Sequence, residues 1–160
     1  MLFKKSEKKN TYTVYAPTDG ICIPLEEVPD PVFAEKMLGE GVAILPANGH
    51  IVSPVSGVVS ELTDSKHAYG LTTDDGLELL LHIGIDTVNL AGEGFQTPLR
   101  KGDRVKAGDL LAEVDLELLK EKGYDLHTPL IVTNMNHIKT LTPIEGDVRQ
   151  AESAVLTYTV

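Results

Sequence analysis

The sequence predicts an all-β protein with a single domain, folded as a sandwich or a barrel. Short apolar runs rich in β-branched residues recur along the chain, at residues 20–25, 41–47, 50–55, 57–62, 77–85, 109–114, 129–133 and 154–160. Gly, Pro, Asp and Asn separate these runs at close intervals, which is typical of strands joined by tight turns. The length of 160 residues suits one hydrophobic core of ordinary size.

Residues 1–11 are polar and lysine-rich, and we expect them to be mobile, with residues 12–160 forming the domain. Three Pro-x-x-Gly segments, at residues 17–20, 54–57 and 143–146, each lead into an apolar strand. Proline fixes φ at the first corner of a turn and glycine permits positive φ further on. These segments therefore predict tight turns where strands begin.

Two short helices are expected between the strands. Residues 30–39 begin with Asp30 as an N-cap, continue with Pro31 at the first helical position and end at Gly39. Residues 115–123 have the same signals, because Asp115 precedes a helical segment that Gly123 ends.

The composition limits the environment and the kind of partner. The formal net charge is −10, which argues against nucleic acid because phosphate backbones are bound by concentrated Lys and Arg. The single cysteine, Cys22, is expected to be a small buried residue, and it allows no disulfide within the chain. No run approaches the roughly 20 apolar residues of a membrane-spanning helix. We expect a cytoplasmic monomer with no stable membrane insertion.

One histidine, His82, lies inside the apolar run at residues 77–85. Strand side chains alternate between two faces, so the odd-numbered residues from Leu77 to Ile85 share one apolar face. Leu80, His82 and Gly84 share the opposite face, away from the core. A histidine bonded to a backbone carbonyl beneath a loop is the alternative to a functional one, and strand parity alone favours neither.

A second histidine, His67, lies one strand upstream, across the turn signal at residues 73–76. If residues 67–73 and 77–83 form a hairpin, His67 and His82 are neighbours near its open end. Two adjacent imidazoles suit a metal site or the handling of protons or phosphoryl groups. Zinc needs three or four protein ligands, and no further ligand occurs at a suitable spacing, which argues against a zinc hydrolase. The remaining histidines are expected at the surface: His50, His127 and His137.

The segment GLELLLHIGIDTV, at residues 76–88, resembles the active-histidine signature of the glucose-type enzyme IIA component of the bacterial sugar phosphotransferase system. Further blocks resemble the same family in the same order, at residues 32–36, 41–44, 54–57, 66–69, 92–95, 102–105 and 132–135. The resemblance extends over residues 15–160, which is nearly the whole chain.

The resemblance implies a compact antiparallel β-sandwich, a barrel–sandwich hybrid, with both histidines in a shallow apolar depression. His82 matches the histidine that takes phosphate on Nε2 from the phosphocarrier HPr and passes it to a cysteine on the IIB domain of a sugar transporter. The Nδ1 hydrogen of His82 is expected to bond the carbonyl of Gly84, which leaves the Nε2 lone pair free. His67 matches the histidine that donates to phosphoryl oxygens. Ser65 replaces the family's usual threonine and keeps its hydroxyl.

The implied activity is a phosphotransferase that requires no cofactor and carries the phosphoryl group on His82. The alternative is a regulatory binding module whose phosphorylation state controls its association with transporters or metabolic enzymes. Weak zinc binding by His67 and His82, completed by a carboxylate from a partner, is a further expectation.

Partners are expected to dock around His82. Parity places Leu80 beside it on the solvent face, and a helix after Asp30 would present Phe33 and Met37 four residues apart. Acidic residues nearby are expected to meet the positively charged surface of HPr. The alternative is that Leu80 and Phe33 pack beneath a loop. The predicted partner surface consists of Asp30, Val32, Phe33, Met37, Leu80 and Asp86.

Overall fold

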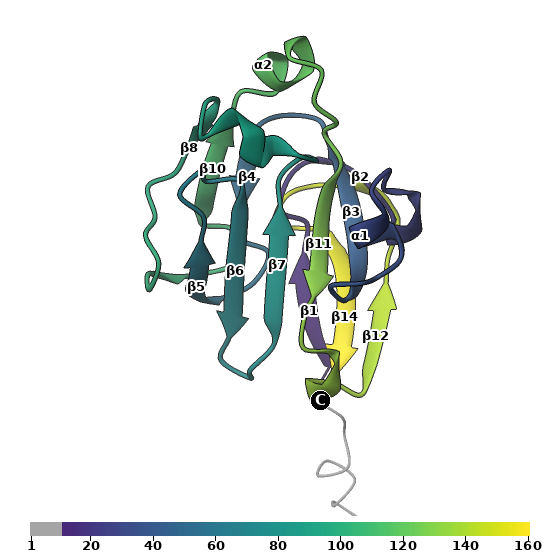
Figure 1. The fold of residues 1–160 in the computed structure, drawn as a ribbon. Coiled ribbons are helices and arrows are strands. Elements are labelled where there is room, and N and C mark those ends of the chain that lie inside the picture. The colour runs from purple at the N-terminus through teal and green to yellow at the C-terminus, as the bar shows by residue number, and fades with distance from the viewer. Residues whose placement is uncertain (1–10) are drawn as a thin grey trace, which may run out of the picture.

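Three antiparallel sheets make up the structure, a computed structural model that describes residues 11–160 (Figure 1). The largest has eight strands in the order β13-β2-β3-β11-β7-β6-β5-β9, and two three-stranded sheets, β1-β14-β12 and β4-β10-β8, lie against it. The strands are β1 (Thr11–Tyr15), β2 (Gly20–Pro24), β3 (Glu40–Pro46), β4 (His50–Val52), β5 (Gly57–Leu62), β6 (Ala68–Thr73), β7 (Glu78–His82), β8 (Phe95–Gln96), β9 (Arg104–Val105), β10 (Leu110–Val114), β11 (Thr128–Val132), β12 (Thr140–Pro143), β13 (Gly146–Val148) and β14 (Ala154–Thr159).

Within residues 11–160, helical structure is limited to short segments. The two α-helices are α1 (Pro31–Ala34) and α2 (Leu116–Glu121), and the single-turn helices are η2 (Leu25–Glu27), η3 (Thr87–Leu90) and η4 (Met135–His137). The predicted antiparallel β-sandwich with one or two short helices is thus confirmed. Each predicted apolar run contains a strand, and each Pro-x-x-Gly segment leads into one. Among the described residues, no helix has the length and apolar character needed to cross a membrane.

The helix expected at residues 30–39 is shorter than predicted. Asp30 accepts a hydrogen bond from the backbone N–H of Val32 (3.0 Å) and acts as the N-cap, as expected. The helix ends at Ala34, and Lys36 has a φ of 58°, which turns the chain out of the helix. Phe33 and Met37 therefore do not share a helix face, and that prediction is wrong. In contrast, α2 matches its prediction, with Asp115 accepting from the N–H of Leu118.

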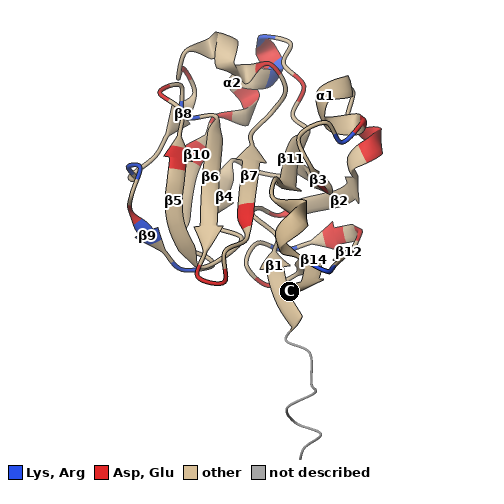
Figure 2. Ribbon diagram, turned by 60° about the horizontal axis from the view of Figure 1, so that its bottom comes forward, with Lys and Arg blue, Asp and Glu red and all other residues tan. Residues whose placement is uncertain are grey.

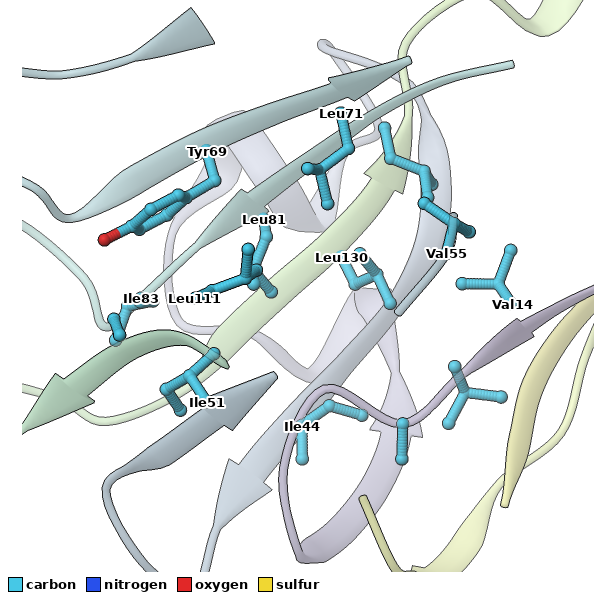
Figure 3. Close-up of a cluster of buried hydrophobic side chains, with 14 of the residues drawn as sticks. Val14, Ile44, Ile51, Val55, Tyr69, Leu71, Leu81, Ile83, Leu111 and Leu130 are labelled. Carbon is cyan, nitrogen blue, oxygen red and sulfur yellow. The ribbon is translucent and has the colours of Figure 1, made fainter. Parts of the chain in front are cut away.

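The main core lies between the inner faces of the three sheets (Figure 3). Leu81 from β7, Leu130 from β11, Ile44 from β3 and Leu111 from β10 are all fully buried there. Cys22 is buried at the edge of this core, as expected, and burial raises the pKa of its thiol to about 12. Every second residue of the central strands faces inward, so the residues between them point to the outer face of the large sheet.

A second apolar cluster covers part of that outer face. Its buried members come from β3, β11, the loop after β7 and the segment η2–α1, and Leu80 packs against them. Figure 1 shows α1 beside β3 and β11, on the side away from the smaller sheets. The cluster consists of Leu25, Val28, Phe33, Ala43, Ile85 and Ile131.

The N-terminal boundary differs from the prediction by one residue. Residues 1–10 of the segment predicted to be mobile lie outside the described residues. Thr11, the last residue of that segment, pairs with Thr159 of β14 and belongs to the first strand. The sequence did not indicate β1 or β12 as separate strands, nor the two-residue strands β8 and β9.

Candidate active site

The hairpin of β6 and β7 brings the two histidines together, as the turn signal predicts. Ala68 pairs with His82 across the hairpin, and the N–H of Ile83 donates to the carbonyl of His67 (2.7 Å). The imidazole centroids lie 4.9 Å apart, with the rings at 83° to one another. The two rings therefore meet edge to face at the open end of the hairpin.

The ring of His82 is held in one tautomer. Its Nδ1 lies 2.8 Å from the carbonyl oxygen of Gly84, the contact expected from the sequence. A carbonyl oxygen can only accept a hydrogen bond, so Nδ1 carries the hydrogen and donates it. Nε2 is left with its lone pair and is able to act as a nucleophile.

The loop after β7 places the Gly84 carbonyl. Gly84 has a φ of 75°, and a Cβ there would lie 2.6 Å from the methyl carbon of Thr87, so both the backbone and the space require glycine. Asp86 is also left-handed, with a φ of 61°. Thr87 is fully buried and donates from Oγ1 to the carbonyl of Ile83 (2.5 Å). Backbone strain of this kind is typical of functional sites whose geometry the surroundings fix.

This loop also corrects the predicted position of Ile85. The strand ends at His82, and the left-handed Gly84 breaks the alternation of side chains. Leu77, Leu79 and the other odd-numbered residues up to Ile83 face the main core as predicted. Ile85 instead packs in the second cluster, on the opposite face.

Two hydroxyl groups contact the ring of His67. Ser65 Oγ lies 2.6 Å from Nδ1, a contact expected of the residue that replaces the family's usual threonine. Thr63 Oγ1 lies 3.3 Å from the same nitrogen. Thr63 also accepts from the N–H of Ala68 (3.2 Å). The sequence reasoning missed this role of Thr63. The available signal was a hydroxyl residue four positions before His67, across a turn that the left-handed Lys66 tightens.

Both imidazoles are neutral near pH 7. Burial, and next the nearby His82 ring, lower the pKa of His67 to about 4. Burial also lowers the pKa of His82, although the bond to Gly84 and the charges of Asp30 and Asp86 oppose this effect. The site therefore holds two uncharged rings, one with a free lone pair and one able to donate a hydrogen bond.

Phe33 borders this pair of rings but is not exposed. Its ring centroid lies 5.1 Å from that of His82, and only 5% of its surface is accessible. Leu80 is half-buried against the second cluster. The prediction of an exposed Leu80 and Phe33 is wrong: Phe33, itself part of α1, is buried in the second cluster, and Leu80 packs against that cluster, which is nearer to the alternative of packing beneath a loop.

The exposed rim of the site is apolar and acidic. Met37 is 66% exposed, and Val88, which the sequence reasoning missed, is 53% exposed. Val32 and Leu38 are exposed as well. Asp30 and Asp86 are close enough to raise the pKa of His82, and acidic segments lie next to α1 in Figure 2. Asp30 and Asp86 therefore lie near His82, whereas a place for the exposed Val32 and Met37 in the partner surface stays a prediction.

The described residues offer few metal ligands. Within residues 11–160, no three His, Cys, Asp or Glu side chains lie close enough to hold a metal ion. A zinc ion on His67 and His82 would need a ligand from a partner, and this expectation stays a prediction. The other three histidines are partly exposed, and each contacts a polar partner. These are His50 with Glu113, His127 with Asp125 and His137 with the carbonyl of Asp75.

Comparison with known protein families gives one match that covers most of the chain. Residues 12–138 match the family described as phosphoenolpyruvate-dependent sugar phosphotransferase system, EIIA 1. This range includes both histidines, the loop after β7 and the segment η2–α1.

Individual relatives agree with this match. A protein from Oceanobacillus iheyensis named PTS system glucose-specific EIIA component is 46% identical over 157 residues, which are 97% of this chain and 95% of the relative. A PTS system glucose-specific EIICBA component from Streptococcus pneumoniae is 48% identical over 134 residues, 84% of this chain and 18% of that longer protein. Among solved structures, the glucose permease IIA from Mycoplasma capricolum superposes with a TM-score of 0.88 at 41% identity, covering 98% of this chain and 99% of the other.

Proposed function

The chain belongs to the EIIA 1 family of the phosphoenolpyruvate-dependent sugar phosphotransferase system, and we propose that it acts there as a phosphohistidine carrier. In this proposal His82 accepts a phosphoryl group from phosphorylated HPr and passes it to the IIB domain of a glucose-type transporter. The observation that carries the proposal is the bond from Nδ1 of His82 to the carbonyl of Gly84, beside a second neutral imidazole.

Phosphoryl acceptance follows from the state of the His82 ring. The Nε2 lone pair attacks the phosphorus atom, a bond from Nε2 to phosphorus forms, and the bond from phosphorus to the donor breaks with its electrons left on the donor. Because Nδ1 keeps its hydrogen, the phosphorylated ring carries a positive charge, which the carbonyl of Gly84 and the nearby Asp30 and Asp86 stabilise. In delivery, the next acceptor attacks the phosphorus atom, and the bond from phosphorus to Nε2 breaks with its electrons returned to Nε2.

His67 supports the transfer as a hydrogen-bond donor. When the hydroxyl of Ser65 donates to Nδ1 of His67, the ring hydrogen is on Nε2. That N–H is available to the phosphoryl oxygens, on which charge develops during transfer. Because burial keeps the pKa of His67 low, the ring donates as a neutral imidazole.

The rim of the site supports transfer between proteins. Met37 and Val88 are exposed apolar residues, and in this proposal a docked partner covers them and excludes water from the phosphoryl group. Asp30 and Asp86 suit a positively charged donor such as HPr. A transporter partner is supported by relatives in which an EIIA segment is part of an EIICBA chain.

The test is incubation with enzyme I, HPr and phosphoenolpyruvate, followed by mapping of the modified residue. We expect phosphate on His82 alone, in a linkage that is labile in acid and stable in base. His82→Ala should accept no phosphate, whereas the control His50→Ala, which removes a histidine outside the site, should accept it at the normal rate. Near-normal acceptance by His82→Ala would disprove the assignment.

A further inference from the structure

The peptide group between Gly84 and Ile85 makes two hydrogen bonds in opposite directions. Its carbonyl, on Gly84, accepts from Nδ1 of His82 (2.8 Å), and its N–H, on Ile85, donates to the backbone carbonyl of Asp125 (3.0 Å). In a trans peptide the C=O and N–H bonds are antiparallel within one plane. The bond to Asp125 therefore sets the direction in which the Gly84 carbonyl points.

Asp125 comes from a distant part of the chain, the connection between α2 and β11. It meets Ile85 in an isolated β-bridge, outside any sheet. The left-handed Gly84 is conformationally permissive, so the residues of the loop do not by themselves fix the orientation of this peptide. An anchor from outside the loop is needed on the N–H side, and the Asp125 carbonyl supplies it.

The side chain of Asp125 holds its own carbonyl in place. Oδ1 accepts from the backbone N–H of His127 (2.8 Å) and lies 2.6 Å from Nδ1 of the His127 ring. This is an Asx-turn, in which the aspartate side chain accepts from the backbone N–H two residues further on. The ring of His127 is mostly buried, with 19% of its side chain exposed, so both contacts are constrained by packing.

We propose that Asp125 is a positioning residue for His82. It touches neither the ring nor a reacting atom. It acts through a series of contacts. The Asp125 carboxylate closes the local turn, and this turn holds the Asp125 carbonyl in place. That carbonyl orients the Gly84–Ile85 peptide, whose own carbonyl keeps the hydrogen on Nδ1 of His82. Its consequence for transfer rests on the proposed function, whereas its effect on the His82 tautomer does not.

The experiment compares Asp125→Ala with Asp115→Ala. Asp115 lies directly before α2 and caps it by accepting from the N–H of Leu118, so both substitutions remove an aspartate that bonds a backbone N–H. The ¹⁵N chemical shifts of the His82 ring report which nitrogen carries the hydrogen. We expect Asp125→Ala to change the tautomer ratio about tenfold towards the Nε2–H form and to slow acceptance from HPr by a similar factor, the lower end of the loss seen when the hydrogen-bond partner behind a metal-bound histidine is removed. Asp115→Ala should leave both unchanged.

The conservative variant Asp125→Asn should restore the wild-type shifts, since its side-chain oxygen still accepts from the N–H of His127. If Asp125→Ala does not fold, Asp125→Ser, which retains a weaker acceptor, replaces it with the same direction of change. Unchanged His82 shifts in a folded Ala or Ser variant would overturn the proposal, even if transfer slowed. A wild-type protein that accepts no phosphate would instead contradict the proposed function and leave the comparison of shifts intact.

Discussion

The two histidines face different kinds of hydrogen-bond partner. His82 donates to a backbone carbonyl that can only accept, and the bond from the Ile85 N–H to the Asp125 carbonyl holds the same peptide group. His67 meets the hydroxyls of Ser65 and Thr63, and a hydroxyl can both donate and accept. The protein therefore imposes one tautomer on His82, whereas it accommodates either tautomer of His67.

The apolar surroundings differ as well. His82 is half-buried and borders the second cluster, where Phe33 covers one side of its ring. His67 is only 5% exposed, and burial depresses its pKa more clearly. The nucleophile is thus rigid and reachable by a partner, while its neighbour is enclosed and neutral. From this difference we expect the two rings to serve separate steps, and substitutions should distinguish those steps.

The largest effect should come from His67→Gln. Glutamine can donate one hydrogen bond, and His82 remains the nucleophile, so acceptance from HPr should fall only slightly. Onward transfer to the IIB domain should fall about 100-fold or more, the loss typical when one donor to a developing charge is removed. Single-turnover rates of the two half-reactions measure this split.

The matched control is His137→Gln at the opposite end of the same hairpin, where His137 contacts the carbonyl of Asp75. It should leave both rates unchanged. Equal losses in both half-reactions of His67→Gln would contradict the division of roles between the rings.

Stability at low pH should also reveal the enclosed histidine. The pKa of His67 is lowered from about 6.5 to about 4, so the unfolded chain binds the proton more tightly than the folded one. The free energy of unfolding should therefore decrease as the pH falls from 6.5 to 4, and level off below that. The shift corresponds to about 3 kcal/mol, and screening at the open side of the site reduces our expectation to about 2 kcal/mol.

Denaturant unfolding of the wild type and of His67→Gln over this range measures the effect as a difference, which removes the contribution of the carboxylates. The variant should lose less stability than the wild type on acidification. Parallel curves for the two proteins would show that His67 titrates normally.

A smaller effect should follow from Thr87→Val, which tests the rigidity of the His82 loop. The valine leaves the carbonyl of Ile83 buried without a partner, which costs about 1–3 kcal/mol of stability. Acceptance from HPr should slow about tenfold as the Gly84 carbonyl loses its support. Ser53→Ala is the control, because Ser53 is equally buried and its hydroxyl also donates to a carbonyl, that of Val55 (2.6 Å), outside the His82 loop. An equal slowing in the control would remove the special role of the loop.

The smallest effect should come from the rim. Met37→Asp should weaken HPr binding by about 1 kcal/mol, as an exposed contact residue would. Its free energy of unfolding should change by no more than about 0.5 kcal/mol. Ile144→Asp, an exposed apolar residue on the turn between β12 and β13, should leave binding unchanged. Titration calorimetry measures the affinity of each variant for HPr. Identical affinities for the two variants would exclude Met37 from the docking surface.

The sequence predicted those features that depend on local pattern. Alternation placed Leu79 and Leu81 in the core and His82 on the opposite face, and the turn signal at residues 73–76 brought His67 next to His82. The Asp115 cap defined α2. In each case the determining contacts lie within one element or between neighbouring strands.

Features that depend on distant contacts or on left-handed residues were not predictable in this way. Lys36 ends α1 early and Gly84 moves Ile85 to the second cluster, although nothing in a local apolar pattern marks these changes. The burial of Phe33 depends on β3 and β11, which are remote in sequence. The contact between Ile85 and Asp125 joins residues forty positions apart, and only the folded chain reveals it.

The central claim, that the protein leaves Nε2 of His82 as the nucleophile, has one direct test. Protein labelled with ¹⁵N in its histidines is phosphorylated through HPr, and the coupling between ³¹P and ¹⁵N is measured with the ring assignments of all five histidines. We predict coupling to Nε2 of His82, with Nδ1 still bearing its hydrogen. Coupling to Nδ1 of His82, or to either nitrogen of His67, would contradict the account.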